Sequence, residues 1–258
     1  GQRVDKILVA DDRAVGLRLA DGAEHRADRV VSAADGHATI FDMLDGAYLD
    51  DAIRTRYETW PLFPGLLYIA MGIDRPFDDV PETVAGVSLA LPEPERIADA
   101  VRDGLPVHVY KQDPTLAPAG KRVAIVMLES DYDHWQALAE DRAAYRAAKD
   151  EAAQTVIRLL DHRWPGLADQ VEMVDVATPL TFERTTGNRQ GTFEGWMLTP
   201  DNAHSIMKPI PQTLPGLDAF AMCGQWVEPG GGLPSGMMSA RRLLQAWCKE
   251  DNRTFKAP

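Results

Sequence analysis

The residues of this sequence best suited to chemistry are three consecutive glycines at positions 230–232 and the stretch that follows them. The apolar residues 220–223 indicate a buried strand, and a helical pattern begins near Pro234. Glycine lets the backbone approach a ligand closely, and the N-terminus of a helix favours negative charge. The order predicts a junction that could hold a phosphate, a carboxylate or an electron-rich ring edge. The alternative is that the glycines form only a tight connection.

Composition limits the classes of protein to which the chain can belong. Its 258 residues, 45% of them hydrophobic, suffice for one large domain or two modest ones. A net charge of −12, without a cluster of Lys and Arg, argues against nucleic-acid binding. No run reaches the roughly 18 to 20 apolar residues of a membrane span.

Neither the cysteines nor the histidines form a recognisable chemical set. Cys223 and Cys248 are the only cysteines, and they have neither a disulfide pattern nor metal-ligand spacing, which favours a reducing, cytoplasmic location. The six histidines are scattered, so we assign no metal site and no catalytic residue. The chain begins with Gly1 and runs directly into a strand, so we expect a fragment or a processed chain.

The pattern along the chain predicts two groups of strands with helices between them. An antiparallel meander is expected first, followed by a buried strand within residues 27–35 and short helices at residues 37–44 and 48–60. A second, mainly antiparallel sheet is expected from residues 65–73, 105–110 and 122–128, with proline-containing loops at 75–81, 91–94 and 113–118. A single helix over residues 135–164 should cover this sheet, followed by a strand at 171–177 and polar, site-lining or surface loops at 178–188 and 191–196.

The order of three motifs carries a resemblance. Residues 27–35, 177–188 and 224–236 follow one another as they do in the C-terminal half of the phytoene desaturase-like and carotenoid isomerase-like flavoproteins, which include relatives of retinol saturase. The whole chain resembles that half. The resemblance implies an α+β fold in which residues 1–44 and 213–258 form part of an FAD-binding domain. Residues 45–212 would form a substrate-binding domain with a mainly antiparallel sheet and covering helices.

The same resemblance assigns residues to the cofactor and to the substrate. The expected flavin contacts are Gly224, Gln225, Gly231, Gly232, Leu233, Pro234 and Met237. The expected substrate contacts are Glu183, Arg184, Trp196 and Trp226. Ser235 stands where relatives often have glycine, and serine still allows close approach. A solvated turn for the Glu–Arg pair and a place in the core for the tryptophans are the alternatives.

One expected motif is absent from the sequence. No G-x-G-x-x-G follows a first strand, so the usual holder of the adenine, ribose and pyrophosphate of FAD is not present. We therefore expect this chain alone to bind FAD weakly or not at all, and an N-terminal half to be missing or to reside in another chain.

The resemblance also implies an activity. In the intact protein, flavin hydride transfer would act on C=C or C–C bonds of an apolar polyene or lipid-like substrate. A flavin-dependent isomerase and a non-catalytic lipid- or partner-binding module are the alternatives. The expected partners are an apolar small molecule and the missing half or a partner chain, with peripheral membrane contact and a homo-oligomer as further expectations.

Overall fold

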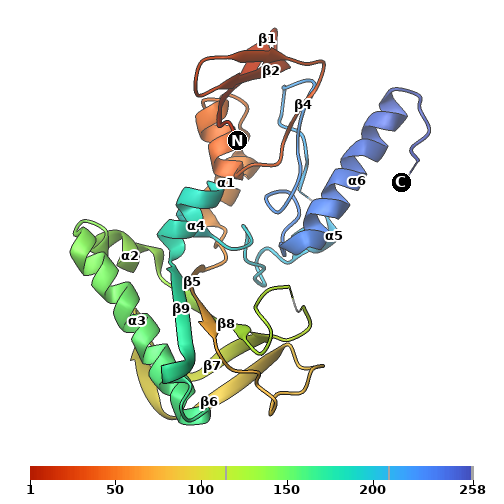
Figure 1. Ribbon diagram of the computed structural model, residues 1–258. Helices are drawn as coiled ribbons and strands as arrows, with labels where there is room; N and C mark the ends of the chain where they lie inside the picture. Colours follow the sequence, from red (N-terminus) through yellow and green to blue (C-terminus); the bar gives the residue numbers. More distant parts are fainter. Residues whose placement is uncertain (114, 209, 257–258) are drawn as a thin grey trace. The chain divides into compact units, whose positions relative to one another are not determined.

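The chain forms two compact units in a computed structural model that describes residues 1–113, 115–208 and 210–256 (Figure 1). The first unit comprises Gly1–Phe63, Gly187–Arg189 and Glu194–Pro258, and the second comprises Pro64–Thr186 and Gln190–Phe193. Pro114, in the loop predicted over residues 113–118, lies outside the described residues, as do Pro209 and residues 257–258 of the predicted domain segments. Each unit has a hydrophobic core of its own. The predicted α+β class is confirmed.

The first unit contains two small sheets. The strands of the antiparallel meander are β1 (Val4–Ala10), β2 (Arg13–Leu19) and β3 (Glu24–Arg26). Strand β4 (Val30–Ser32) pairs in parallel with β10 (Phe220–Met222), which returns from the far end of the chain. The helices of this unit are the π-helix η1 (Ala38–Met43), α1 (Asp51–Thr59), α5 (His204–Met207) and α6 (Gly232–Glu250). The unit is thus completed only by the last part of the sequence.

The division between the units differs from the predicted domain boundaries. Residues 45–63 and 194–212 were predicted to belong to the substrate-binding domain, but they lie in the first unit. The physical reason is packing, because Ile53 and Trp196 are buried in the same cluster as Phe220. Apolar side chains that share one core are removed from water together, which joins their segments into one cooperative body.

The second unit is built on a five-stranded antiparallel sheet. Its strands are β5 (Gly65–Ile73), β6 (Gly86–Ile97), β7 (Ala100–Tyr110), β8 (Arg122–Ser130) and β9 (Val171–Ala177), in the order β6-β7-β8-β5-β9. Burial alternates along β5, so that Leu67, Ile69 and Met71 face the core. Helix α3 (Arg142–Arg163) lies along the sheet in Figure 1 and contributes Val156 and Leu160 to that core. The predicted mainly antiparallel sheet with a covering helix is confirmed.

The helix predicted over residues 135–164 is wrong in one respect, because two helices replace it. These are α2 (Tyr132–Leu138) and α3, with a break at residues 139–141. The Asp141 carboxylate accepts a hydrogen bond from Ala143 N at 2.8 Å and so caps the start of α3. A side chain that satisfies the free N–H groups favours a new helix start over continuation.

Two predicted loops are also regular structure. Residues 91–94, predicted as a loop, lie within β6. Strand β6 is at the edge of the sheet, and its pairing with β7 is irregular between Ala90 and Glu95, so its prolines remove no bond from a central ladder. Residues 178–188, predicted as a polar loop, contain helix α4 (Pro179–Thr186). Pro179 is its first residue, where proline is favoured because no N–H is needed.

Candidate functional site

The junction between β10 and α6 has the architecture that the sequence predicted. The loop leaves β10 at Cys223, passes through Gly224 and reaches α6 through Gly230 and Gly231. Ser239 fixes the two elements together, because its Oγ accepts a hydrogen bond from Gly224 N at 2.8 Å and donates one to Ser235 O at 2.7 Å. The start of the loop is therefore held against the second turn of the helix.

Positive backbone φ angles explain the glycines of this loop. Gly224 has φ +97°, Gly230 +100°, Gly231 +59° and Gly232 +74°. Side chains larger than hydrogen are strained in this region, so glycine is required for the path of the chain. A Cβ at Gly224 would meet nothing within 4 Å, and the same holds for Gly236 in the first turns of α6. These two positions face open space, where a ligand could approach the backbone.

The N-terminus of α6 carries no side-chain cap. Gly231 precedes the helix and has no side chain, while the Ser235 hydroxyl donates to Gly232 O at 2.8 Å. The first-turn N–H groups of a helix carry a partial positive charge, equivalent to about half an elementary charge for the whole dipole. Helix α6 spans 19 residues, so the aligned dipoles are well developed. This end suits an anionic or electron-rich group.

Apolar side chains surround the same helix end without being buried. Leu233 is 87% exposed and Met237 is 73% exposed, and these two residues are one turn apart on α6. Leu244, farther along, is also exposed. Burial of such side chains would be favourable at about 25 cal/mol per Å², so this face is suited to contact with another molecule. The predicted flavin contacts Leu233 and Met237 therefore lie on an exposed surface, and contact with a flavin stays a prediction for both.

A second segment of the first unit, within the loop predicted at residues 191–196 as site-lining or surface, packs closely against the glycine loop. A Cβ built on Gly231 would lie 2.3 Å from Glu194 Cβ, and one built on Gly195 would lie 3.3 Å from Gln225 Cγ. The contact joins residues that are far apart in the sequence, so no local pattern could reveal it. Glu194 and Gly195 are therefore part of the candidate site.

The end of β4 is held by a buried carboxylate. Asp35 is 4% exposed and accepts hydrogen bonds from Ala38 N at 2.8 Å and from Arg189 N at 2.9 Å. Next to it, a Cβ on Gly36 would lie 2.2 Å from the Tyr57 hydroxyl and 2.9 Å from Trp226 Cβ. Glycine at position 36 therefore allows close packing after β4.

Burial raises the pKa of Asp35 above its usual value of 3.8, against the lowering effect of its hydrogen bonds with Arg189 and Ala38. Because the folded-state pKa is the higher one, the contribution of Asp35 to stability is fully present below pH 3.8 and is lost as the pH rises through the folded-state pKa. We expect Asp35→Asn to remove this decline from a plot of unfolding free energy against pH. The amide has one oxygen in place of two, so the variant also loses one of the hydrogen bonds from Ala38 N and Arg189 N. Urea unfolding across this acidic range measures the slope. Asp28→Asn is the control, because Asp28 is exposed. If unfolding free energy varied with pH in the same way in both variants, the pH dependence would not come from Asp35.

The two predicted substrate tryptophans lie in the core of the first unit. Trp196 is 1% exposed and Trp226 is 3% exposed, with ring centroids 5.0 Å apart. Trp196 Nε1 donates to Trp226 O at 3.1 Å. These are packing contacts, and contact with a substrate stays a prediction for both residues.

Glu183 and Arg184 lie in the second unit, on α4. Glu183 accepts hydrogen bonds from the Tyr132 hydroxyl at 2.7 Å and from Gln190 N at 2.9 Å, and the bond to Glu183 raises the pKa of Tyr132 to about 12. Arg184 is exposed. Glu183 therefore connects α2, α4 and the segment after α4, and its predicted contact with a substrate stays a prediction.

Two further expectations concern metals and membranes. Among the described residues, no three or more His, Cys, Asp or Glu side chains are grouped so that they could hold a metal ion. No helix in the described ranges combines the length and the apolarity needed to cross a membrane.

Solved structures define the class of fold. An oxidoreductase from Methanosarcina mazei aligns with 94% of this chain and 49% of its own length, at a TM-score of 0.55 and 21% identity. A putrescine oxidase triple mutant, from a redesign of cofactor binding, aligns with 96% of this chain and 48% of its own length, at a TM-score of 0.60 and 12% identity. The fold is thus one found in oxidoreductases.

Sequence similarity to curated proteins indicates which oxidoreductases the chain resembles. No family model matches the chain. Prolycopene isomerase of Arabidopsis thaliana is 26% identical over 246 residues, which cover 93% of this chain and 40% of the relative. Phytoene desaturase (neurosporene-forming) of Rhodobacter capsulatus is 25% identical over 257 residues, which cover 94% of this chain and 47% of the relative. The chain therefore resembles part of the carotenoid isomerase-like and phytoene desaturase-like, FAD-dependent oxidoreductases, as predicted.

The similarity covers only part of each relative, so it does not extend to the activity of the whole relative. The chain spans less than half of the length of either relative. The plant relatives are named as chloroplastic, and the cytoplasmic location expected from the cysteines stays a prediction.

Proposed function

We propose that this chain supplies the flavin-ring side of an FAD-dependent oxidoreductase that acts on an apolar polyene or lipid-like substrate. The observation that supports the proposal best is the uncapped N-terminus of α6, reached through three positive-φ glycines. Open space at the Cβ positions of Gly224 and Gly236 fits close approach of a flat ring. When bound, a flavin supplies the capacity to accept or return a hydride.

The chain's own residues would bind and orient the cofactor. The backbone at Gly224 and Gln225 would approach the ring, and the first turn of α6 would stabilise negative charge near it. Leu233, Pro234 and Met237 would give the ring an apolar surface and exclude water from it. Gly231 and Gly232 would shape the loop. Stabilisation of charge by groups that are already in place avoids the cost of reorganising water.

In this proposal, the substrate class and the type of reaction are taken from the names of the relatives. Their names include both an isomerase of prolycopene and a desaturase of phytoene, which are polyene reactions at carbon–carbon bonds. We propose a polyene or a similarly apolar lipid as substrate, with desaturation and isomerisation both consistent with the site. The exposed apolar face of α6 supports contact with a polypeptide that carries the dinucleotide fingerprint.

Flavin titration tests the cofactor part of the proposal. Because only the ring side is assigned to this chain, we expect the purified chain to bind FAD and riboflavin with similar, weak affinity, measured by quenching of flavin fluorescence. The product of the complete reading frame should retain FAD through purification. Stoichiometric FAD on the purified chain, or FAD affinity far above that for riboflavin, would show that the adenosine holder is present and would contradict the division of the site.

Product analysis tests the reaction. The product of the complete reading frame, incubated with phytoene or with a cis-configured polyene, should yield a desaturated or an isomerised compound detectable by chromatography and absorption. A reading frame that begins at the position of Gly1, with no flavin bound and no product formed, would instead favour the non-catalytic lipid- or partner-binding module.

A further inference from the structure

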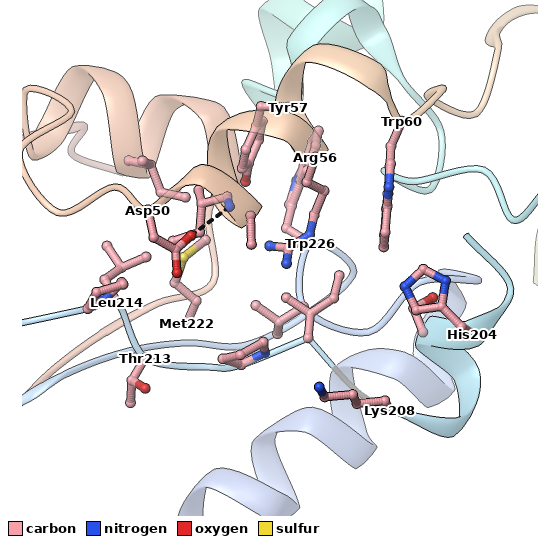
Figure 2. Close-up of a pocket in the computed structure, with 18 residues that line it drawn as sticks. Asp50, Arg56, Tyr57, Trp60, His204, Lys208, Thr213, Leu214, Met222 and Trp226 are labelled. Atoms are coloured by element: carbon pink, nitrogen blue, oxygen red, sulfur yellow. Dashed lines mark hydrogen bonds between the residues drawn. The ribbon is translucent and has the colours of Figure 1, made fainter. Parts of the chain in front are cut away.

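A cavity of about 460 Å³ lies in the first unit, apart from the glycines of the α6 junction (Figure 2). Its walls come from α1, from the end of β10 with the loop after it, and from a segment that includes His204, Ser205, Lys208 and Leu214. Apolar and aromatic side chains predominate among them, including Ile53, Tyr57, Trp60 and Leu214. This volume and this lining are typical of sites for small organic molecules.

Three residues that line this cavity each have a buried polar atom without a hydrogen-bond partner among the described residues. These atoms are Arg56 Nε, Ser205 Oγ and Trp226 Nε1. Ser205 is 4% exposed and Trp226 is 3% exposed. An unsatisfied buried donor is destabilising, so native proteins rarely leave several of them on the residues around one cavity. All three groups can donate, which calls for a ligand that presents acceptors.

The charges around the cavity favour an anion. Figure 2 shows Arg56 extending from α1 toward Trp226, with Asp50 on one side and Trp60 and His204 on the other. The Asp50 carboxylate already accepts a hydrogen bond from Ile53 N at 2.7 Å. Lys208 and His204 add basic groups to the wall. The cationic groups therefore outnumber the single carboxylate.

Arg56 has the chemistry of the primary anchor. Its guanidinium lies 5.4 Å from the centroid of the Trp60 ring, and no salt bridge to it is found among the described residues. Burial lowers the pKa of Arg56, as expected for a cation without a close counter-ion. The planar fork of a guanidinium matches the two oxygens of a carboxylate.

We propose that this cavity is a binding site for an apolar carboxylic acid of medium chain length. The carboxylate accepts hydrogen bonds from Arg56, Ser205 and Trp226, and the hydrocarbon part lies against Ile53 and Trp60. The inference does not depend on the flavin site, since neither Gly224 nor the residues of the α6 N-terminus line this cavity.

Calorimetric titration with decanoate, with 1-decanol as the neutral match, tests the proposal on the full chain. We expect one decanoate per chain and an affinity at least tenfold above that for decanol. Loss of a hydrogen bond to a charged group costs about 1.5–3 kcal/mol, so Arg56→Gln should weaken decanoate binding roughly 10- to 100-fold. Trp226→Phe and Ser205→Ala, which each remove one donor, should weaken it by smaller factors of roughly 3 to 10.

Arg54→Gln is the matched control, because Arg54 is exposed on the same helix and does not line the cavity. It should leave decanoate affinity unchanged, and thermal melting should show that both arginine variants fold. Arg56→Lys, which keeps the charge without the fork, should retain part of the affinity. Equal affinities for decanoate and decanol, or equal effects of Arg56→Gln and Arg54→Gln, would overturn the proposal. Loss of binding in Leu233→Ser with none in Arg56→Gln would also overturn it, by placing the ligand on the exposed face of α6.

Discussion

Trp196→Ala is expected to lower the unfolding free energy of the first unit by about 3–5 kcal/mol, the range for removal of a fully buried large aromatic side chain. Trp196 is 1% exposed, and its ring packs against Tyr57 at 4.9 Å and Trp60 at 5.8 Å between centroids. The substitution leaves a cavity in this aromatic cluster and also removes the hydrogen bond to Trp226 O. The expected effect is thus one of stability rather than of substrate affinity.

Hydrogen exchange followed by mass spectrometry can measure this effect unit by unit. Peptides from residues 1–63 and 220–250 should lose protection in Trp196→Ala, while peptides from residues 64–186 should keep it, because the second unit has its own core. Met197→Ala, at the adjacent and partly exposed position, is the control and should cost under about 1 kcal/mol. Equal loss of protection in both units would contradict the independence of the two cores.

Gly231→Ala is expected to destabilise the α6 junction by about 2–6 kcal/mol, the sum of two costs. Gly231 has φ +59° and ψ −162°, a combination that essentially only glycine adopts and that costs a larger residue about 1–3 kcal/mol. In addition, the new Cβ would lie 2.3 Å from Glu194 Cβ, and overpacking of this kind costs about 1–3 kcal/mol. We also expect flavin binding by the product of the complete reading frame to weaken, because the loop can no longer follow its path.

Two further variants separate the causes. Gly236→Ala, in a helical position with nothing within 4 Å of the added Cβ, should leave stability unchanged or raise it by up to about 1 kcal/mol. Gly231→Ala combined with Glu194→Gly removes the clash but keeps the backbone strain, so it should recover only part of the loss. Chemical unfolding of all four proteins measures the differences. Gly231→Ala as stable as Gly236→Ala would show that the loop does not need glycine at position 231.

The sequence predicted those parts of the fold that local patterns determine. Alternating burial along β5 and the strand–glycine–helix order at residues 220–247 are visible in residue types alone. The errors arose where position in the sheet or capping overrides composition. The prolines of residues 91–94 are tolerated because β6 is an edge strand, and Asp141 starts a new helix within a continuous helical pattern.

The candidate site was predictable only on one side. The three glycines at 230–232 can be recognised in the sequence as a loop motif. The contact of Gly231 with Glu194, in contrast, joins segments that only the tertiary fold brings together. The same is true of the cavity that Arg56, Ser205 and Trp226 line, since these residues come from three separate stretches. Unpartnered buried donors are a property of the folded state, and no sequence pattern reports them.

The pairing of β4 with β10 has a consequence for synthesis on the ribosome. Val30 is translated before the second unit, but its partner Phe220 is added only after the whole of Pro64–Thr186 has been translated. The second unit is nearly continuous in sequence and can therefore fold during translation, whereas the early strands must wait for the C-terminal residues. Until then the edge of β4 lacks its partner β10, and such an edge is open to pairing with another strand.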